Sequence, residues 1–75
     1  MKTAIYSEDG WKAKVEILED TSTEKYYQYK LKVLFTILDS SMFKTPPDGD
    51  IFTMYQIKDG FWGGMARLID IQEEK

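Results

Sequence analysis

Residues 25–38, KYYQYKLKVLFTIL, decide the fold expected for this chain. From Tyr27 to Ile37 every second residue is apolar or aromatic, and as far as Lys32 the residues between them are polar. A period of two is the pattern of a half-buried β-strand, and the period of an amphipathic helix is absent. After Val33 both faces are apolar, so we expect the strand to bend there and to contribute to a core on each side. The stretch therefore predicts one long β-strand in a strongly curved sheet.

Four further segments repeat this alternation and are separated by turn sequences. A short strand is expected at Lys2–Tyr6, before the hairpin signal Asp9-Gly10, and the others are expected at 11–18, 51–58 and 65–72. The predicted fold is an all-β, five-stranded antiparallel meander. It either closes into a small SH3-like or OB-like barrel, which we favour, or stays a strongly curled open sheet.

Composition limits both the size of the domain and its chemistry. The chain has 75 residues, of which 43% are hydrophobic and 15% aromatic, enough for one small domain over 1–75 with a solvated tail at 72–75. It contains no cysteine and no histidine, which removes the thiol nucleophile, the commonest general base and the usual zinc ligands. The pairs Asp48/Asp50 and Glu8/Asp9 lie in turn sequences, where acidic residues are expected for backbone reasons. We therefore expect no enzyme activity, no metal and no cofactor.

Charge gives a second, weaker indication of function. The net charge of −3 argues against a dedicated nucleic-acid binder, whose affinity depends on neutralising phosphates. A hairpin register in which paired positions sum to 44 would set Lys14 opposite Lys30 and Lys12 opposite Lys32. These four lysines form either a solvated, edge-protecting face or an anion-binding patch, the latter for single-stranded nucleic acid or an acidic protein.

Aromatic content is the most informative feature. Eleven residues are Phe, Trp or Tyr, more than so small a core can bury. The period places five of them inward: Trp11, Tyr27, Tyr29, Phe35 and Tyr55. Other large side chains fall on the opposite face of the strand expected at 51–58, in the long 39–50 connection, or at the corner Phe61–Gly64. The aromatic pair beside glycines at this corner resembles SH3-like barrels in architecture. These side chains either close the ends of the barrel or form an exposed apolar patch. The patch would be a protein interface formed by Met42, Phe43, Phe52, Met54, Trp62 and Arg67.

The sequence thus favours a small protein-interaction or accessory module that self-associates through an aromatic and methionine patch. The alternative is a barrel that binds single-stranded nucleic acid or another anionic ligand through the lysines. A polar N-terminal segment and the lack of cysteine indicate the cytoplasm, without a membrane partner.

Overall fold

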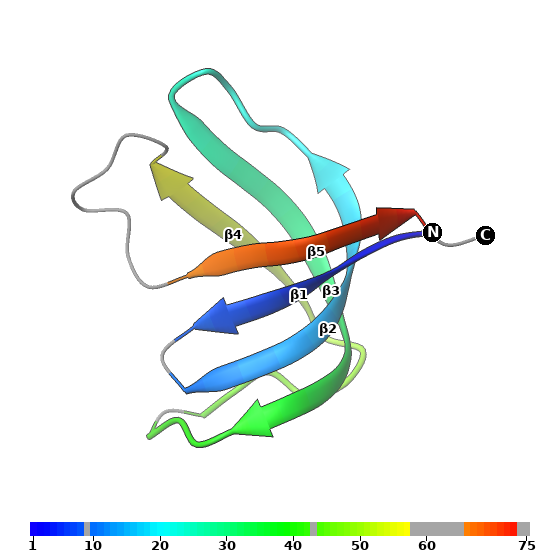
Figure 1. The fold of residues 1–75 in the computed structure, drawn as a ribbon, viewed down its shortest axis with the longest axis vertical. Helices are drawn as coiled ribbons and strands as arrows, with labels where there is room; N and C mark the ends of the chain where they lie inside the picture. Colours follow the sequence, from blue (N-terminus) through cyan, green and yellow to red (C-terminus); the bar gives the residue numbers. More distant parts are fainter. Residues whose placement is uncertain (9, 43, 58–65, 74–75) are drawn as a thin grey trace.

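Five strands form a single antiparallel sheet in the computed structural model, which describes residues 1–8, 10–42, 44–57 and 66–73. The strand order across the sheet is β4-β3-β2-β1-β5 (Figure 1). The all-β prediction is confirmed. The described residues include no helix of the length and hydrophobicity that crossing a bilayer requires. The strands are β1 (Lys2–Glu8), β2 (Trp11–Asp20), β3 (Tyr26–Asp39), β4 (Ile51–Ile57) and β5 (Arg67–Glu73).

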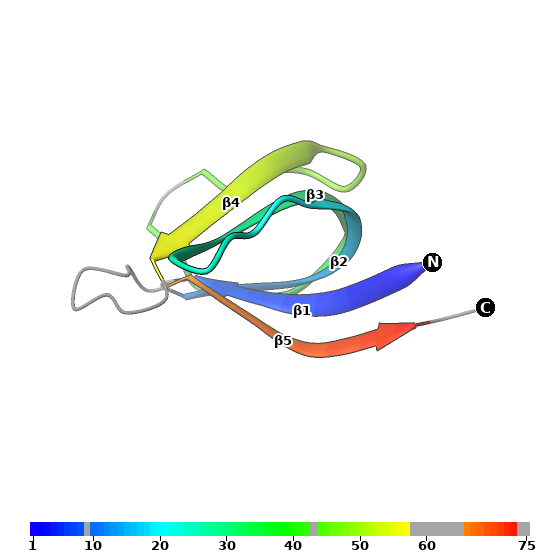
Figure 2. The same cartoon turned by 90° about the horizontal axis from the view of Figure 1, so that it is seen from above.

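The sheet is strongly curled but open. Seen from above, β3 and β4 lie over β1 and β5, and β2 follows the bend between the two layers (Figure 2). Instead of continuing the meander beside β4, β5 pairs with the other edge of β1, where Leu68 lies opposite Tyr6. In five antiparallel strands the two edge strands share one direction, so closure would require a less stable parallel pair. The open curled sheet is thus correct, and the favoured closed barrel is wrong.

The hairpin of β2 and β3 turns later than predicted. The Thr23 N–H donates to the Tyr26 carbonyl at 2.8 Å, so the turn lies at residues 24–25. Paired positions sum to 48–50 rather than 44, which sets Glu16 opposite Lys32 and Glu19 opposite Lys30. The predicted lysine pairs do not form, because this register joins opposite charges, which stabilise a sheet where like charges destabilise it.

Irregularities in the pairing of β2 with β3 redirect the second half of β3. Val33 lies opposite the buried Val15, but Phe35 lies opposite Lys14, so the register shifts between these two pairs. A bulge of this kind bends a strand and changes the face that its side chains occupy. The pairing becomes irregular after Val33, where the bend was predicted, but the expected core on each side is wrong, because Ile37 and Leu38 are each 50% exposed. The prediction that Phe35 is in the core is wrong, because 52% of its surface is exposed.

The core lies on the concave face of the sheet. Trp11 and Tyr29 belong to it as predicted, whereas Tyr27 and Tyr55 are exposed and their predicted burial is wrong. The buried hydrophobic residues are Ala4, Tyr6, Trp11, Ala13, Val15, Tyr29, Leu31, Val33 and Met54. Each strand except β5 contributes at least one of them, and Leu68 of β5 packs against the cluster.

Strand β4 presents the opposite face from the one predicted. It pairs with β3 so that Phe52 lies opposite Leu31 and Met54 lies opposite Tyr29, both on the concave side. The register follows the turn before β4, where the Gly49 N–H donates to the Val33 carbonyl at 2.7 Å with φ at +88°. Because β4 is apolar on both faces, its periodicity alone does not determine which face turns inward.

Strand β5 also contains a bulge. Ile69 pairs with Ile5 and Gln72 pairs with Thr3, and between them Asp70 has a φ of 51°, in the left-handed region that Asp tolerates. The strand continues through Glu73, so the tail predicted at 72–75 begins too early. Positions 74–75 lie outside the described residues.

Candidate interaction surfaces

The convex side of the sheet carries two neighbouring cross-strand rows of apolar and basic residues. We call these rows the basic–apolar face. Antiparallel pairing places the members of each row side by side across four strands. From β5 through β1 and β2 to β3, the first row is Ile69, Ile5, Lys14 and Phe35, and the second is Arg67, Ser7, Lys12 and Leu38.

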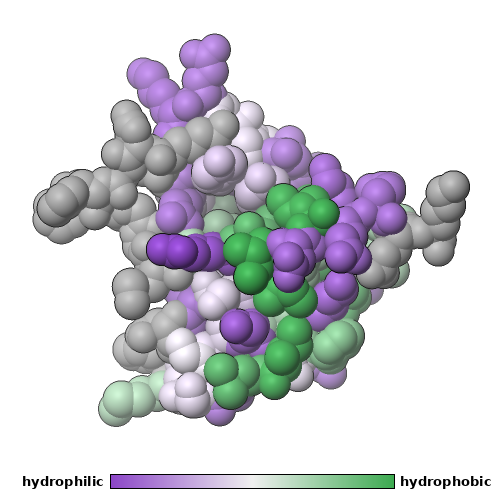
Figure 3. All heavy atoms as spheres, viewed as in Figure 1, coloured by the Kyte–Doolittle hydropathy of each residue, from purple (hydrophilic) through white to green (hydrophobic). Residues whose placement is uncertain are grey.

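Large apolar groups on this face are open to solvent. Phe35, Leu38 and Ile69 are 52%, 50% and 43% exposed. Figure 3 shows hydrophobic and hydrophilic residues interspersed over these strands. Lys12 and Lys14 are half-buried, as expected when lysine stems lie along apolar neighbours. The two rows contain three cations and no carboxylate, although the whole chain has a net charge of −3.

The predicted anion-binding lysines divide into two pairs. Lys12 and Lys14 lie on the basic–apolar face, together with Arg67, which was predicted as an interface residue. Lys30 and Lys32 lie on the other half of β3, opposite Thr53 and Ile51 of β4. The structure therefore does not bring the four lysines together as predicted.

The other predicted interface residues are more scattered. Met42 follows β3 and is 96% exposed. Met54 is buried and Phe52 is half-buried against the core, so the surface positions predicted for them are wrong. Both side chains turn toward the core because β4 presents the opposite face from the one predicted. Phe43 and Trp62 lie outside the described residues.

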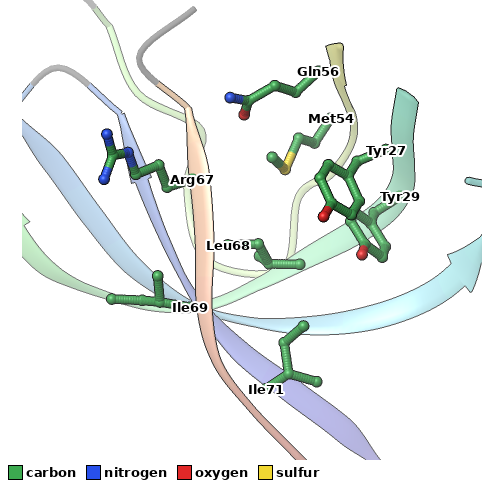
Figure 4. A pocket seen from close by; sticks show the side chains of 8 residues that line it. All are labelled: Tyr27, Tyr29, Met54, Gln56, Arg67, Leu68, Ile69 and Ile71. Carbon is green, nitrogen blue, oxygen red and sulfur yellow. The ribbon is translucent and has the colours of Figure 1, made fainter. Parts of the chain in front are cut away.

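A cleft of about 290 Å³ lies where β4 and β5 face each other across the open side of the curl (Figure 4). Its aromatic wall consists of Tyr27 and Tyr29, whose rings stack at 6.1 Å between centroids. Burial raises the pKa of Tyr29 above its ordinary value. The cleft suits a small apolar group, and its other lining residues are Met54, Gln56, Arg67, Leu68, Ile69 and Ile71.

A second cleft, of about 210 Å³, adjoins an aromatic cluster that the sequence did not predict. The ring centroid of Tyr6 lies 5.1 Å from that of Phe52 and 5.4 Å from that of Trp11. The Tyr6 hydroxyl donates to Glu8 Oε2 at 2.7 Å, and Trp11 Nε1 donates to Thr36 Oγ1 at 3.3 Å. These contacts join β1, β2, β3 and β4, so they stabilise the curl itself.

The Tyr6 hydroxyl makes stability sensitive to alkaline pH. Burial raises the pKa of Tyr6, and the hydrogen bond to Glu8 and its negative charge raise it further. The unfolded chain then loses this proton near the ordinary pKa of about 10, while the folded protein retains it. We expect the stabilisation to be complete below pH of about 10 and to decline as pH rises beyond that value.

Thermal denaturation at increasing pH measures this effect. Tyr6→Phe should lose less stability than the wild type above pH of about 10, because it lacks the shifted phenol. The exposed Tyr55→Phe should follow the wild type. Equal losses in the wild type and in Tyr6→Phe would contradict the assignment to Tyr6.

No known protein family, no curated protein and no solved structure matches this chain. The functional argument therefore depends on the surfaces themselves.

Sequence reasoning missed most apolar members of the basic–apolar face. Alternation predicts Phe35 in the core and gives Ile5, Leu38 and Ile69 no surface role. The available signal was the segment Val33–Leu38, in which five of the six residues are apolar. A strand that is apolar on both faces either lies within a core or has one face available for a partner.

Proposed function

We propose that this protein is a non-enzymatic protein-interaction module whose basic–apolar face binds an acidic partner segment that also carries apolar side chains. One observation supports the proposal most strongly. Two adjacent rows place three cations among exposed aliphatic and aromatic side chains, with no acidic residue, on a chain that is acidic as a whole.

The chemistry of this face matches that of a protein interface. Interfaces have an apolar centre and are enriched in aromatic residues and arginine. Phe35 and Ile69 supply apolar area at the two ends of one row, and Arg67 adds a planar donor for carboxylates. Complementary charge on the partner would accelerate binding and exclude basic competitors, while apolar contacts supply most of the affinity.

Single-stranded nucleic acid is the weaker candidate for the same cations. Sequence-tolerant binding of single strands uses aromatic rings on which bases stack, beside a positively charged groove. The stacked rings of Tyr27 and Tyr29 line the cleft on the concave side instead, where Arg67 is the single cation among the described lining residues. Phe35 is the single aromatic residue of the basic–apolar face. The lack of cysteine supports the cytoplasm as the compartment in which the module works.

Titration of the isotope-labelled protein with defined peptides tests the proposal. The probe is a synthetic extended peptide that alternates Glu with Leu and Phe, and a matched peptide has Lys in place of Glu. We expect the acidic peptide to shift the amide resonances of Ile5, Lys14 and Ile69, and its affinity to fall as salt rises from about 50 to 300 mM. The lysine peptide should bind at least about tenfold more weakly.

A double variant and an oligonucleotide complete the test. Phe35→Thr with Ile69→Thr removes apolar contact area at exposed sites and places β-branched residues in both strands, so the fold should survive and peptide affinity should fall about tenfold or more. Ile51→Thr, on the remote strand β4, should leave affinity unchanged. The proposal is wrong if oligothymidylate binds this face and the acidic peptide does not.

A further inference from the structure

Among the described strands, β4 forms one edge of the sheet, and this edge lacks the usual protection of an exposed sheet edge. Its sequence, IFTMYQI, contains no charged residue, no proline and no glycine. Edge strands normally carry lysine, proline or a bulge, because an unprotected edge pairs with other strands. The other edge strand, β5, has Arg67, a bulge at Asp70 and a terminal Glu73. The two edges of this sheet therefore differ, and β4 is the edge without features that prevent pairing with another strand.

Backbone groups on this edge are available for a ladder. The Val33 N–H donates to the Asp50 carbonyl at 2.9 Å, and the β3–β4 register continues without a shift. Because inward and outward bonding alternates along an antiparallel strand, Ile51, Thr53 and Tyr55 direct their N–H and C=O groups away from β3. Within the described part of the chain, no backbone hydrogen bond reaches these outward groups.

We propose that this edge binds the same edge of a second copy of the chain, with the two β4 strands antiparallel about a two-fold axis. An axis at Thr53 sets Ile51 of one copy opposite Tyr55 of the other. These side chains are 52% and 57% exposed in the single chain, and the pairing would cover both. An aliphatic residue opposite an aromatic one is a favourable cross-strand pair. The assembled sheet would be continuous across both copies.

A second copy suits this edge better than a charged partner strand does. Each β4 is uncharged, so self-pairing brings no like charges into direct opposition. Among the described residues, the nearest lysines on this face are Lys30 and Lys32, one strand inward on β3. Lys30 of the two copies would be separated by three strand spacings, about 14 Å, beyond the screening length of about 10 Å at 0.1 M salt. Repulsion between these lysines is therefore small at this contact.

Sedimentation measurements over about 1–100 µM test the dimer, since this concentration range brackets the affinity of a modest interface. We expect the wild type to reach twice the chain mass at the upper end. In the same range, amide exchange at Thr53 and Tyr55 should slow as concentration increases. This second readout assigns the contact to the β4 edge rather than to the basic–apolar face.

Thr53→Pro is the decisive variant. It removes an outward N–H and no β3–β4 ladder bond, so proline is tolerated there as on other sheet edges. Each dimer loses the bond twice, and we expect the dissociation constant to rise about tenfold or more. Tyr55→Lys, which adds edge protection without proline, should have the same effect if Thr53→Pro proves poorly folded. The double variant Phe35→Thr with Ile69→Thr is the matched control and should dimerise as the wild type does.

Each other outcome overturns the proposal. A wild-type chain that stays monomeric at about 100 µM has no self-pairing edge of useful affinity, even if it binds strands of other proteins. A dimer that is unaffected by both β4 variants but lost in the control double variant uses the basic–apolar face instead. Binding of the acidic peptide by a strict monomer would leave the proposed function intact and remove only the dimer.

Discussion

Leu31→Ala is expected to lower the free energy of unfolding by about 3 kcal/mol, the largest effect among the substitutions considered. Leu31 is fully buried at the centre of β3, where Ile17 of β2 and Phe52 of β4 lie on either side of it. Truncation removes its apolar contacts and leaves a cavity that the surrounding strands fill only in part. A domain of this length has a total stability on the order of 4–11 kcal/mol, so the loss is a large share of it.

Urea denaturation followed by tryptophan fluorescence gives this value, and Leu38→Ala is the matched control. Leu38 is on the same strand but 50% exposed, so the same truncation should cost less than about 1 kcal/mol. Similar losses at both positions would mean that the end of β3 is covered in solution. The Leu31 variant would then no longer distinguish the core from the convex surface.

Gly10→Ala is expected to cost about 2–3 kcal/mol, because two separate effects act at this turn. Gly10 has a φ of +89°, which L-residues rarely adopt. An added Cβ would also lie 3.2 Å from the Ser40 carbonyl carbon and from the Ser41 backbone nitrogen. The Gly10 carbonyl accepts from the Ser40 N–H at 2.8 Å, so the two segments cannot separate without losing that bond. The substitution therefore strains the turn and loosens the end of β3.

Gly49→Ala separates the two effects. Gly49 has a φ of +88°, nearly that of Gly10, but among the described residues beyond its chain neighbours no atom lies within 4 Å of the place that an added Cβ would occupy. We expect a cost of about 1 kcal/mol from the backbone conformation alone. The difference between the two variants in urea denaturation measures the contact with Ser40 and Ser41. Equal costs would show that this contact relaxes freely.

Periodicity predicted the strands far better than it predicted how they pair. The alternation of residues 25–38 was sufficient to place β3, because a period of two is a local property of the chain. The register with β2 depends on where the turn forms, and the polar segment before Tyr26 allows several positions. The observed register sets Glu16 opposite Lys32, a favourable alignment that is not visible until both strands are aligned.

The faces of the strands were predicted correctly where one face is polar and wrongly where both are apolar. Trp11 and Tyr29 alternate with charged or amide residues, and they are buried as predicted. Phe52 and Met54 alternate with other apolar residues, so the turn at Gly49 determines their direction. Phe35 changes face through a bulge, a feature that strict alternation does not represent.

The candidate site was predictable only in part for the same reason. Arg67, Lys12 and Lys14 were singled out from the sequence, but as members of two separate surfaces. They share one face because β5 pairs with β1 and so adjoins β2 across a single strand. That arrangement depends on which edge the last strand joins, and this choice is made by tertiary packing.

The pairing of β1 with β5 also has a kinetic consequence. Lys2 lies opposite Glu73, so this ladder closes a loop that includes nearly the whole described chain, whereas the other three ladders join consecutive strands. Contacts so distant along the chain form slowly, because the entropy of loop closure is lost before they are made. The first four strands can assemble before β5 pairs, and until then the edge of β1 that includes Ile5 has no partner strand. The docking of β5 is therefore the step at which refolding and aggregation compete.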